Sequence, residues 1–117
     1  KSVEIAAGRL LRSPACDCLL VTRGSRGMLL AEKGMKHRLF PIFGDTQIVD
    51  VTGAGDTVIS VFSLAWAASG SFLRASLLAN LAGALSVMKM GAAVLTPREL
   101  KNGTDLYKDS LDRLAQA

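Results

Sequence analysis

Apolar residues recur along this chain with two periods, which predicts that helices and strands are mixed in it. Residues 2–12 carry apolar side chains at helical spacing, and Ser13-Pro14 closes that helix. The short apolar run 18–22 is typical of a buried parallel strand. After a turn, residues 28–32 predict a second strand, and residues 36–41 predict a third.

The second half of the chain is dominated by two long apolar segments. The first begins at Thr52-Gly-Ala-Gly-Asp56 and continues as a helix through Ala68. It is apolar on nearly every side, so we expect it to be central and buried, with Trp66 anchoring the core. The second segment, residues 72–90, predicts another long helix. Residues 47–51, just before the first of these helices, are short and prone to form a strand.

The chain ends with two further helix signals. Thr96-Pro-Arg-Glu99 has the pattern of a helix start, with Thr as the N-cap, Pro at the first helical position and Glu closing a capping box. An amphipathic helix is predicted over residues 106–115. Strands followed by helices that can cover them indicate an α/β fold.

Composition limits the classes of partner. The chain has 117 residues, half of them apolar and about a fifth charged, with a net charge of +4. This suits one globular domain, and a mildly basic balance fits phosphate ligands without requiring them. There is no arginine-rich stripe with interleaved aromatic residues, so nucleic acid is not an expected partner. The longest apolar stretch, residues 58–68, is too short to span a bilayer, so no membrane is expected either.

The cysteines give no sign of a disulfide or a metal site. Cys16 and Cys18 are two positions apart, too far along an extended backbone for a good disulfide. His37 is the only histidine, so a zinc site would lack ligands. Two reduced thiols indicate a reducing, cytoplasmic compartment.

The segment Asp50-Val-Thr-Gly-Ala-Gly-Asp56 carries the clearest chemistry. Glycines at 53 and 55 let the backbone approach a ligand, and the first amides of the following helix favour an anion such as phosphate. Asp56 is then either a general base that takes a proton from an attacking hydroxyl or only the cap of the helix. No Gly-Lys-Ser/Thr follows, so the segment is not a P-loop. Val58 stands where a dinucleotide-binding fingerprint has its third glycine, which disfavours an oxidoreductase.

Three segments resemble the ribokinase (PfkB) family of sugar kinases. Residues 50–57 are similar to that family's second signature, and residues 21–27 to the strand-turn-strand before its nucleotide site. Asn80 matches the helix that borders the adenine pocket. Order and spacing agree over nearly the whole chain. The resemblance implies an α/β fold in which residues 1–117 form the C-terminal part of a ribokinase-like doubly wound sheet with flanking helices.

The resemblance also implies roles for single residues. Asp56 would be the base that activates the sugar hydroxyl. The implied anion hole consists of the amides of Gly53, Ala54 and Gly55. Asp50 and the carbonyl of Thr52 would hold a monovalent cation, K⁺. The implied nucleotide-binding residues are Thr22, Gly24, Gly27 and Asn80, and Mg²⁺ would arrive with ATP.

Within the family, the chain is most similar to bacterial heptose 7-phosphate kinases, which serve ADP-heptose and lipopolysaccharide core synthesis. Residues 19–23, 50–59 and 89–100 carry this likeness. Two alternatives stay open. One is another PfkB-type kinase, acting on ribose, fructose phosphate or a nucleoside. The other is a nucleotide-binding fragment without catalysis.

Part of the family pattern has no counterpart in this chain. Its first signature, a glycine-rich run, is absent, and Lys1 begins in what has the pattern of a helix interior. We therefore expect the N-terminal half of the kinase to be a partner that supplies most sugar contacts. The chain alone is expected to be inactive as a kinase. Because the helix through Ala68 is so apolar, the isolated chain is also expected to self-associate as a homo-oligomer or to be poorly stable.

Overall fold

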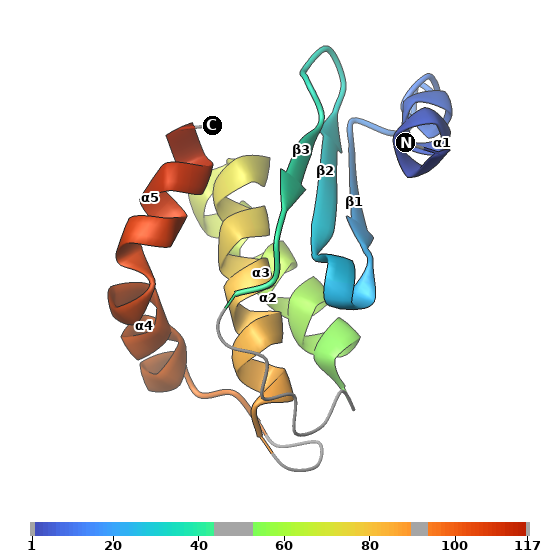
Figure 1. Cartoon of the computed structure of the whole chain (residues 1–117). Helices are drawn as coiled ribbons and strands as arrows, with labels where there is room; N and C mark the ends of the chain where they lie inside the picture. The colour runs from blue at the N-terminus through green and yellow to red at the C-terminus, as the bar shows by residue number, and fades with distance from the viewer. Residues whose placement is uncertain (1, 44–52, 90–93, 117) are drawn as a thin grey trace. The chain divides into compact units, whose positions relative to one another are not determined.

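The computed structural model describes residues 2–43, 53–89 and 94–116. The chain divides into two compact units, Lys1–Pro41 and Ile42–Ala117, and each is described by itself (Figure 1). The predicted strand over 47–51 lies outside the described residues.

The first unit is a three-stranded antiparallel meander with one helix. Its elements are α1 (Ser2–Leu10), β1 (Cys18–Thr22), the 3-10 turn η1 (Gly24–Arg26), β2 (Met28–Glu32) and β3 (Arg38–Phe40), with sheet order β1-β2-β3. The expectation that residues 18–22 form a parallel strand is wrong, because β1 pairs antiparallel with β2. Only five residues join the two strands. A parallel pair needs a crossover of a dozen or more.

Helix α1 covers one face of this sheet. Leu19 pairs with Ala31 and Val21 with Leu29, so these four side chains lie on the same face. Ala7 of α1 and Leu11, just beyond its end, complete an apolar cluster with them. The apolar residues at helical spacing in α1 and those at two-residue spacing in β1 and β2 therefore pack into one small core.

The turn between β1 and β2 depends on Gly27. Its φ of +81° lies in the left-handed region, and a Cβ atom there would lie 1.8 Å from the carbonyl oxygen of Phe40 on β3. The Arg23 amide donates to the Gly27 carbonyl at 2.8 Å, and the Gly27 amide donates to the Gly24 carbonyl at 3.2 Å. Gly27 therefore allows the turn to pass directly against the third strand.

The second unit consists of helices in its described part. They are α2 (Ala54–Ser69), α3 (Phe72–Val87), α4 (Pro97–Leu106) and α5 (Lys108–Gln116). Helices α4 and α5 follow one another beside α3 (Figure 1). Gly70, at φ +67°, ends α2, and Ser71 caps α3 by accepting a hydrogen bond from the Arg74 amide. The predicted helix over 106–115 instead begins at Lys108, because Tyr107 interrupts it.

Helix α3, and not α2, is the central helix of this unit. The buried residues of α3 are mostly small: Ala75, Ser76, Leu77, Ala79, Asn80, Leu81, Ala82 and Ser86. A Cβ atom at Gly83 would lie 2.8 Å from Val58 Cγ2 on α2, and one at Gly103 of α4 would lie 2.6 Å from Leu85 Cδ1. Small residues thus let neighbouring helices approach α3 closely.

The expectation of a buried α2 is wrong for this chain. Val58 is its one buried residue, whereas Ile59, Leu64 and Trp66 are 58%, 72% and 46% exposed. Trp66 does not anchor the core but stacks on Phe72 of α3, with ring centroids 5.5 Å apart. An apolar pattern on all sides shows that a helix must be covered, but it does not identify what covers it.

The cysteines are both free thiols. The Cys16 thiol donates to the Cys18 carbonyl at 3.6 Å. Burial, reinforced by Glu32, raises the pKa of Cys18 to about 11. Within residues 2–43, 53–89 and 94–116, no helix has the length and apolar character needed to cross a membrane.

Replacing Gly27 by alanine should destabilise the first unit strongly. The new Cβ atom would collide with the backbone of β3, which cannot move without breaking the sheet. Gly24→Ala is the matched control, since Gly24 also has a positive φ but no heavy atom lies within 4 Å of its Cβ position. Gly24→Ala should lower the free energy of unfolding by only about 1–2 kcal/mol, which is the cost of a left-handed backbone conformation for a residue with a Cβ atom. Urea unfolding, with hydrogen exchange of the β2 amides as the signal, measures the free energy of unfolding of both variants. Equal losses of stability in the two variants would contradict the steric explanation.

Candidate active site

Helix α2 begins without a side-chain cap. Its N-cap is Gly53, which has a left-handed φ of +78° and no side chain to bond the first amides. The Thr57 amide donates to the Gly53 carbonyl at 3.0 Å, so the helical bonds start there. The amides of Ala54, Gly55 and Asp56 therefore have no acceptor within the helix. Together with the helix dipole, they form a site that favours an anion.

Asp56 is the third residue of α2 and is exposed. The interpretation of Asp56 as the helix cap is wrong, because Gly53 occupies the capping position. The Asp56 carbonyl accepts a hydrogen bond from the Ser60 hydroxyl at 2.7 Å, which is an ordinary bond between successive helical turns. The Asp56 carboxylate thus lies in the first turn of the helix, beside the uncapped amides.

A cavity of about 520 Å³ opens beside this helix start. It is bounded by the first turns of α2, the end of α3 and the segment that leads into α4. Its described lining residues are Gly53, Asp56, Thr57, Ser60, Val61, Leu64, Ser86, Val94, Leu95, Thr96, Pro97 and Leu100. Asp56, Thr57 and Ser60 make the part near the helix start polar, whereas Val61, Leu64 and Leu100 are apolar. The cavity can therefore hold a polar group beside the anion site.

One wall of the cavity is held by Lys89. Its Nζ donates to the Val94 carbonyl at 2.8 Å and contacts the two carboxylate oxygens of Glu99 at 2.6 Å each. The Glu99 carboxylate also accepts from the amide and hydroxyl of Thr96, at 3.1 and 3.0 Å. We call these four residues the Lys89 clamp.

The capping box in the clamp was predicted from sequence and is confirmed. The role of Lys89 was missed. The only signal for it was a lysine ten residues before a glutamate, which is too common a pattern to single out. In the structure this lysine fixes the residues that face Asp56 across the cavity.

The four residues predicted for the anion hole and the base lie together. Gly53 and Asp56 line the cavity, and Ala54 and Gly55 are the first two residues of α2. Asp50 and Thr52, predicted to hold a monovalent cation, lie outside the described residues. Among the residues that the structure describes, no three His, Cys, Asp or Glu side chains come close enough to hold a metal ion.

The predicted nucleotide-binding residues are spread over both units. Asn80 is 6% exposed in the middle of α3 and is absent from the described lining of the cavity. Thr22 ends β1, Gly24 begins η1, and both are exposed, whereas Gly27 is buried. These three residues form one turn of the first unit.

Comparisons with known proteins identify the family and the fold. The family model described as pfkB family carbohydrate kinase matches residues 4–99. The "Bifunctional protein HldE" of Coxiella burnetii is 42% identical over 102 residues, covering 86% of this chain and 21% of that protein. The chain thus spans about a fifth of the length of this curated relative.

Solved structures show the same fold. Ribokinase from Thermotoga maritima matches with a TM-score of 0.79 and 28% identity, over 88% of this chain and 34% of that one. Ribokinase from Arabidopsis thaliana, solved with ribose and ATP, matches with a TM-score of 0.73 and 29% identity, over 87% and 32%. These likenesses confirm the predicted α/β, ribokinase-like fold.

The Lys89 clamp should leave a signature in the titration of Glu99. Hydrogen bonds from Lys89, and then from Thr96, lower the pKa of Glu99 below its ordinary value of 4.5. A carboxylate with a lowered folded pKa stabilises the fold above its unfolded pKa, and this stabilisation is lost as the pH falls through the folded pKa. Lys89→Met should therefore raise the Glu99 pKa towards 4.5 and move acid unfolding of the second unit to higher pH.

Carboxylate NMR of Glu99 and acid titration of helicity measure the two effects. Lys101→Met, on the exposed side of α4, is the control that removes a lysine without touching the clamp. The same Glu99 midpoint in all three proteins would show that the clamp does not form in solution.

Proposed function

Because the chain belongs to the pfkB family of carbohydrate kinases, we propose that it carries the phosphoryl-transfer end of an ATP-dependent sugar kinase. The observation that carries this proposal is the uncapped start of α2 beside the Asp56 carboxylate at the cavity. A negative side chain next to an anion site is unfavourable for simple phosphate binding. It suits a reaction in which a hydroxyl must lose its proton beside a phosphate.

In this reaction Asp56 accepts the proton of the sugar hydroxyl while that oxygen bonds to the terminal phosphorus of ATP. The bond from phosphorus to the ADP oxygen breaks, and ADP leaves with its electron pair. The amides of Gly53, Ala54 and Gly55 donate to the phosphoryl oxygens, on which charge is concentrated in the transition state. Mg²⁺, when bound, would neutralise charge on the phosphates. Asp56 is the one carboxylate in the described cavity lining. The ATP phosphates would therefore supply most of the ligands of the Mg²⁺ ion.

Thr22, Gly24, Gly27 and Asn80 would serve the nucleotide. Gly27 is required by the turn itself, so only its backbone is available to a ligand. Asn80 is buried in α3, and the resemblance would place it at the border of the adenine pocket. Thr22 and Gly24 are exposed, so a ligand could contact both of them.

The sugar in this proposal is heptose 7-phosphate, which would place the protein in the cytoplasm at ADP-heptose and lipopolysaccharide core synthesis. Its support is the similarity of residues 19–23, 50–59 and 89–100 to heptose kinases and the likeness to HldE proteins. The ribokinase matches keep a second candidate, another pfkB-type kinase acting on ribose, fructose phosphate or a nucleoside. A non-catalytic nucleotide-binding fragment is the third.

The chain covers about a third of a ribokinase, so the proposal assigns sugar positioning to the remaining part of the kinase fold. Residues 1–117 alone would then have no sugar kinase activity, since positioning of the substrate is a large part of this catalysis. Activity is therefore to be measured after this chain has been joined to the remaining part of a family kinase.

Asp56→Asn should lower kcat of that kinase by about 10²–10⁴-fold, the usual contribution of a general base. Asparagine keeps the size of the side chain but cannot take a proton, so the affinity for ATP should hardly change. Asp105→Asn, an exposed carboxylate on α4 outside the cavity lining, is the matched control. The rate of sugar-phosphate formation measures kcat, and ATP titration measures the affinity for ATP. A normal kcat in Asp56→Asn would refute the role of Asp56 as the general base.

Potassium should raise turnover if Asp50 and the Thr52 carbonyl bind a monovalent cation. Replacing K⁺ by tetramethylammonium at constant ionic strength removes the small cation and leaves screening unchanged. Turnover of the wild type should be lower in tetramethylammonium than in K⁺, and this difference in turnover should be much smaller in Asp50→Asn. Equal wild-type turnover in the two salts would refute the binding of a cation by Asp50.

A further inference from the structure

The cavity wall that leads into α4 is held in place by few contacts. Residues 94–97 form this wall, across the cavity from the start of α2. Among the described residues, Lys89 makes the one hydrogen bond of Val94, whose carbonyl accepts from Nζ at 2.8 Å, and Leu95 makes none. Val94 is also 80% exposed, so packing does not fix it. The position of this wall therefore depends on the Lys89 clamp.

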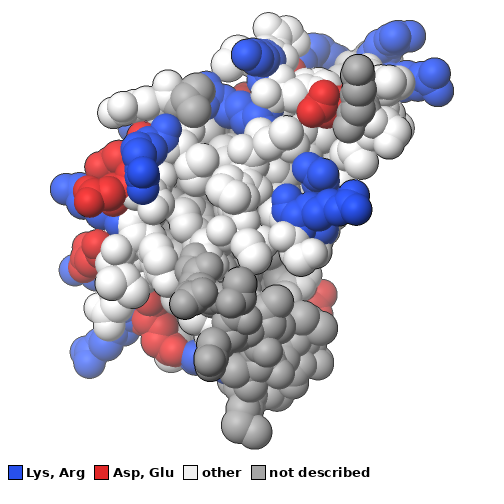
Figure 2. All heavy atoms as spheres, in the orientation of Figure 1, with Lys and Arg blue, Asp and Glu red and all other residues white. Residues whose placement is uncertain are grey.

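The ion pair in the clamp differs from the other charges of the surface. Acidic and basic side chains stand close together over α4 and α5 (Figure 2). Yet the described part of the chain has only two ion pairs, Lys33 with Asp17 at 3.9 Å and Lys89 with Glu99 at 2.6 Å. The Lys89 side chain is 26% exposed, against 43% for Lys33, and an ion pair is stronger where water is partly excluded. The closer pair of the two is thus the one at the cavity.

Both walls of the cavity are placed by contacts with α3. On one side, Val58 of α2 packs against Gly83 of α3, which places the first turn of α2 and Asp56. On the other side, Gly103 brings the body of α4 close to α3. The segment before α4 is bound by Lys89, which follows the end of α3 at Val87. The separation of Asp56 from the facing wall therefore depends on Lys89 as well as on helix packing.

We propose that Lys89 is a positioning residue for phosphoryl transfer, because it fixes the wall across the cavity from Asp56. This role rests on the proposed function of Asp56 as the general base. Lys89 is outside the described cavity lining, so it acts through Val94 and Glu99. A general base must lie within hydrogen-bond reach of the acceptor hydroxyl, and a misplacement of about 1 Å can lower the rate about 10²-fold. Loss of Lys89 therefore lowers kcat and leaves the affinity for ATP nearly unchanged.

The test uses a joined kinase, in which the stretch of the Coxiella burnetii relative that precedes its match to this chain stands in front of residues 1–117. With ATP and heptose 7-phosphate, Lys89→Met should lower kcat by about 10-fold or more. ATP titration of the same variant should give the wild-type affinity. Lys89→Arg keeps a cation that can bind a carboxylate through two hydrogen bonds, so it should recover most of the lost kcat.

Lys33→Met is the matched control. Lys33 Nζ donates to the Ser13 carbonyl at 3.0 Å and pairs with Asp17, so it makes the same two kinds of contact as Lys89. It belongs to the first unit and is outside the described lining of the cavity. Its removal should lower the melting temperature without lowering kcat. Equal losses of kcat in Lys33→Met and Lys89→Met would overturn the positioning role, since they would trace the loss to stability alone.

A double variant separates position from charge. In Lys89→Met the Glu99 charge is left unbalanced, whereas Lys89→Met/Glu99→Gln removes both charges and keeps a glutamine that can still close the capping box. If Lys89 acts through the wall, the double variant has the same low kcat as Lys89→Met, because both changes break one contact. A double variant with wild-type kcat would overturn the proposal, and it decides the question even if Lys89→Met fails to fold.

Hydrogen exchange of the Thr96 amide reports on the wall without any turnover. This amide donates to the Glu99 carboxylate at 3.1 Å, so it should exchange faster in Lys89→Met than in the wild type. A wild-type joined kinase that phosphorylates neither heptose 7-phosphate nor ribose would refute the proposed function and leave this measurement unaffected. Unchanged exchange of Thr96, or a normal kcat of Lys89→Met in an active kinase, would overturn the positioning role alone.

Discussion

The contact between α2 and α3 at Val58 and Gly83 is the constraint on which the second unit depends. Because Gly83 has no side chain, Val58 reaches the α3 backbone, and a Cβ atom would lie 2.8 Å from its methyl group. This contact sets the direction of α2 and, with it, where the uncapped amides and Asp56 lie. On α4, Gly103 meets Leu85 in the same way and brings the other wall of the cavity to α3. Two glycines thus set the width of the candidate active site.

Local signals predicted local structure well. The Thr96–Glu99 capping box was readable because all its partners lie within four residues, and the long helix after Asp56 ends one residue beyond its predicted end. The likeness to a family, carried by residues 50–57 and 21–27, gave the fold. The side-chain pattern could not give strand direction, since an apolar run of five residues looks alike in parallel and antiparallel sheets. The five-residue link to β2 was the better evidence.

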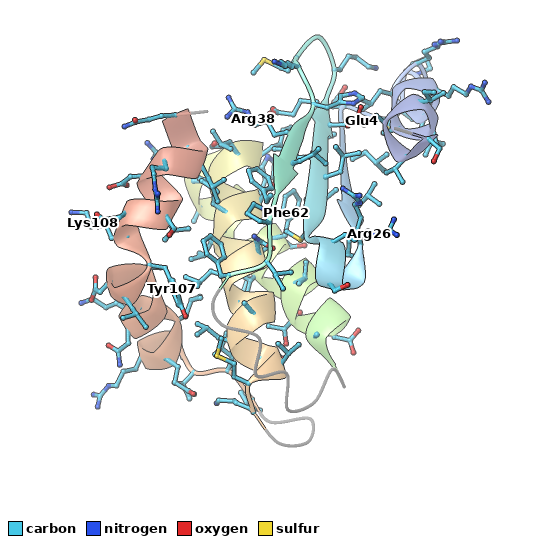
Figure 3. All side chains as sticks on the ribbon, viewed as in Figure 1. Glu4, Arg26, Arg38, Phe62, Tyr107 and Lys108 are labelled. Carbon is cyan, nitrogen blue, oxygen red and sulfur yellow. The ribbon has the colours of Figure 1, made fainter. Side chains whose placement is uncertain are left out.

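Features that depend on distant residues were missed. The hydrophobicity of α2 was read correctly, but its location was not, because burial depends on what is packed around a helix. The Lys89 clamp joins residues ten positions apart across a loop. The break between α4 and α5 at Tyr107 comes with a ring contact to Phe43, 5.7 Å away and distant in sequence (Figure 3 labels Tyr107). Asp50 and Thr52, outside the described residues, remain predictions from the resemblance alone.

The glycine cap of α2 also has a consequence for the behaviour of the helix in the absence of a ligand. Serine or aspartate at the N-cap of a helix binds one of the first amides with its side chain but is better than glycine by only about a few tenths of a kcal/mol, and at Gly53 the left-handed φ of +78° favours glycine. With glycine, those amides stay open to solvent, and the first turn frays more readily than the rest of the helix. An anion at this site would supply the acceptor that the glycine cap lacks. We therefore expect anion binding to reduce the fraying of the first turn of α2.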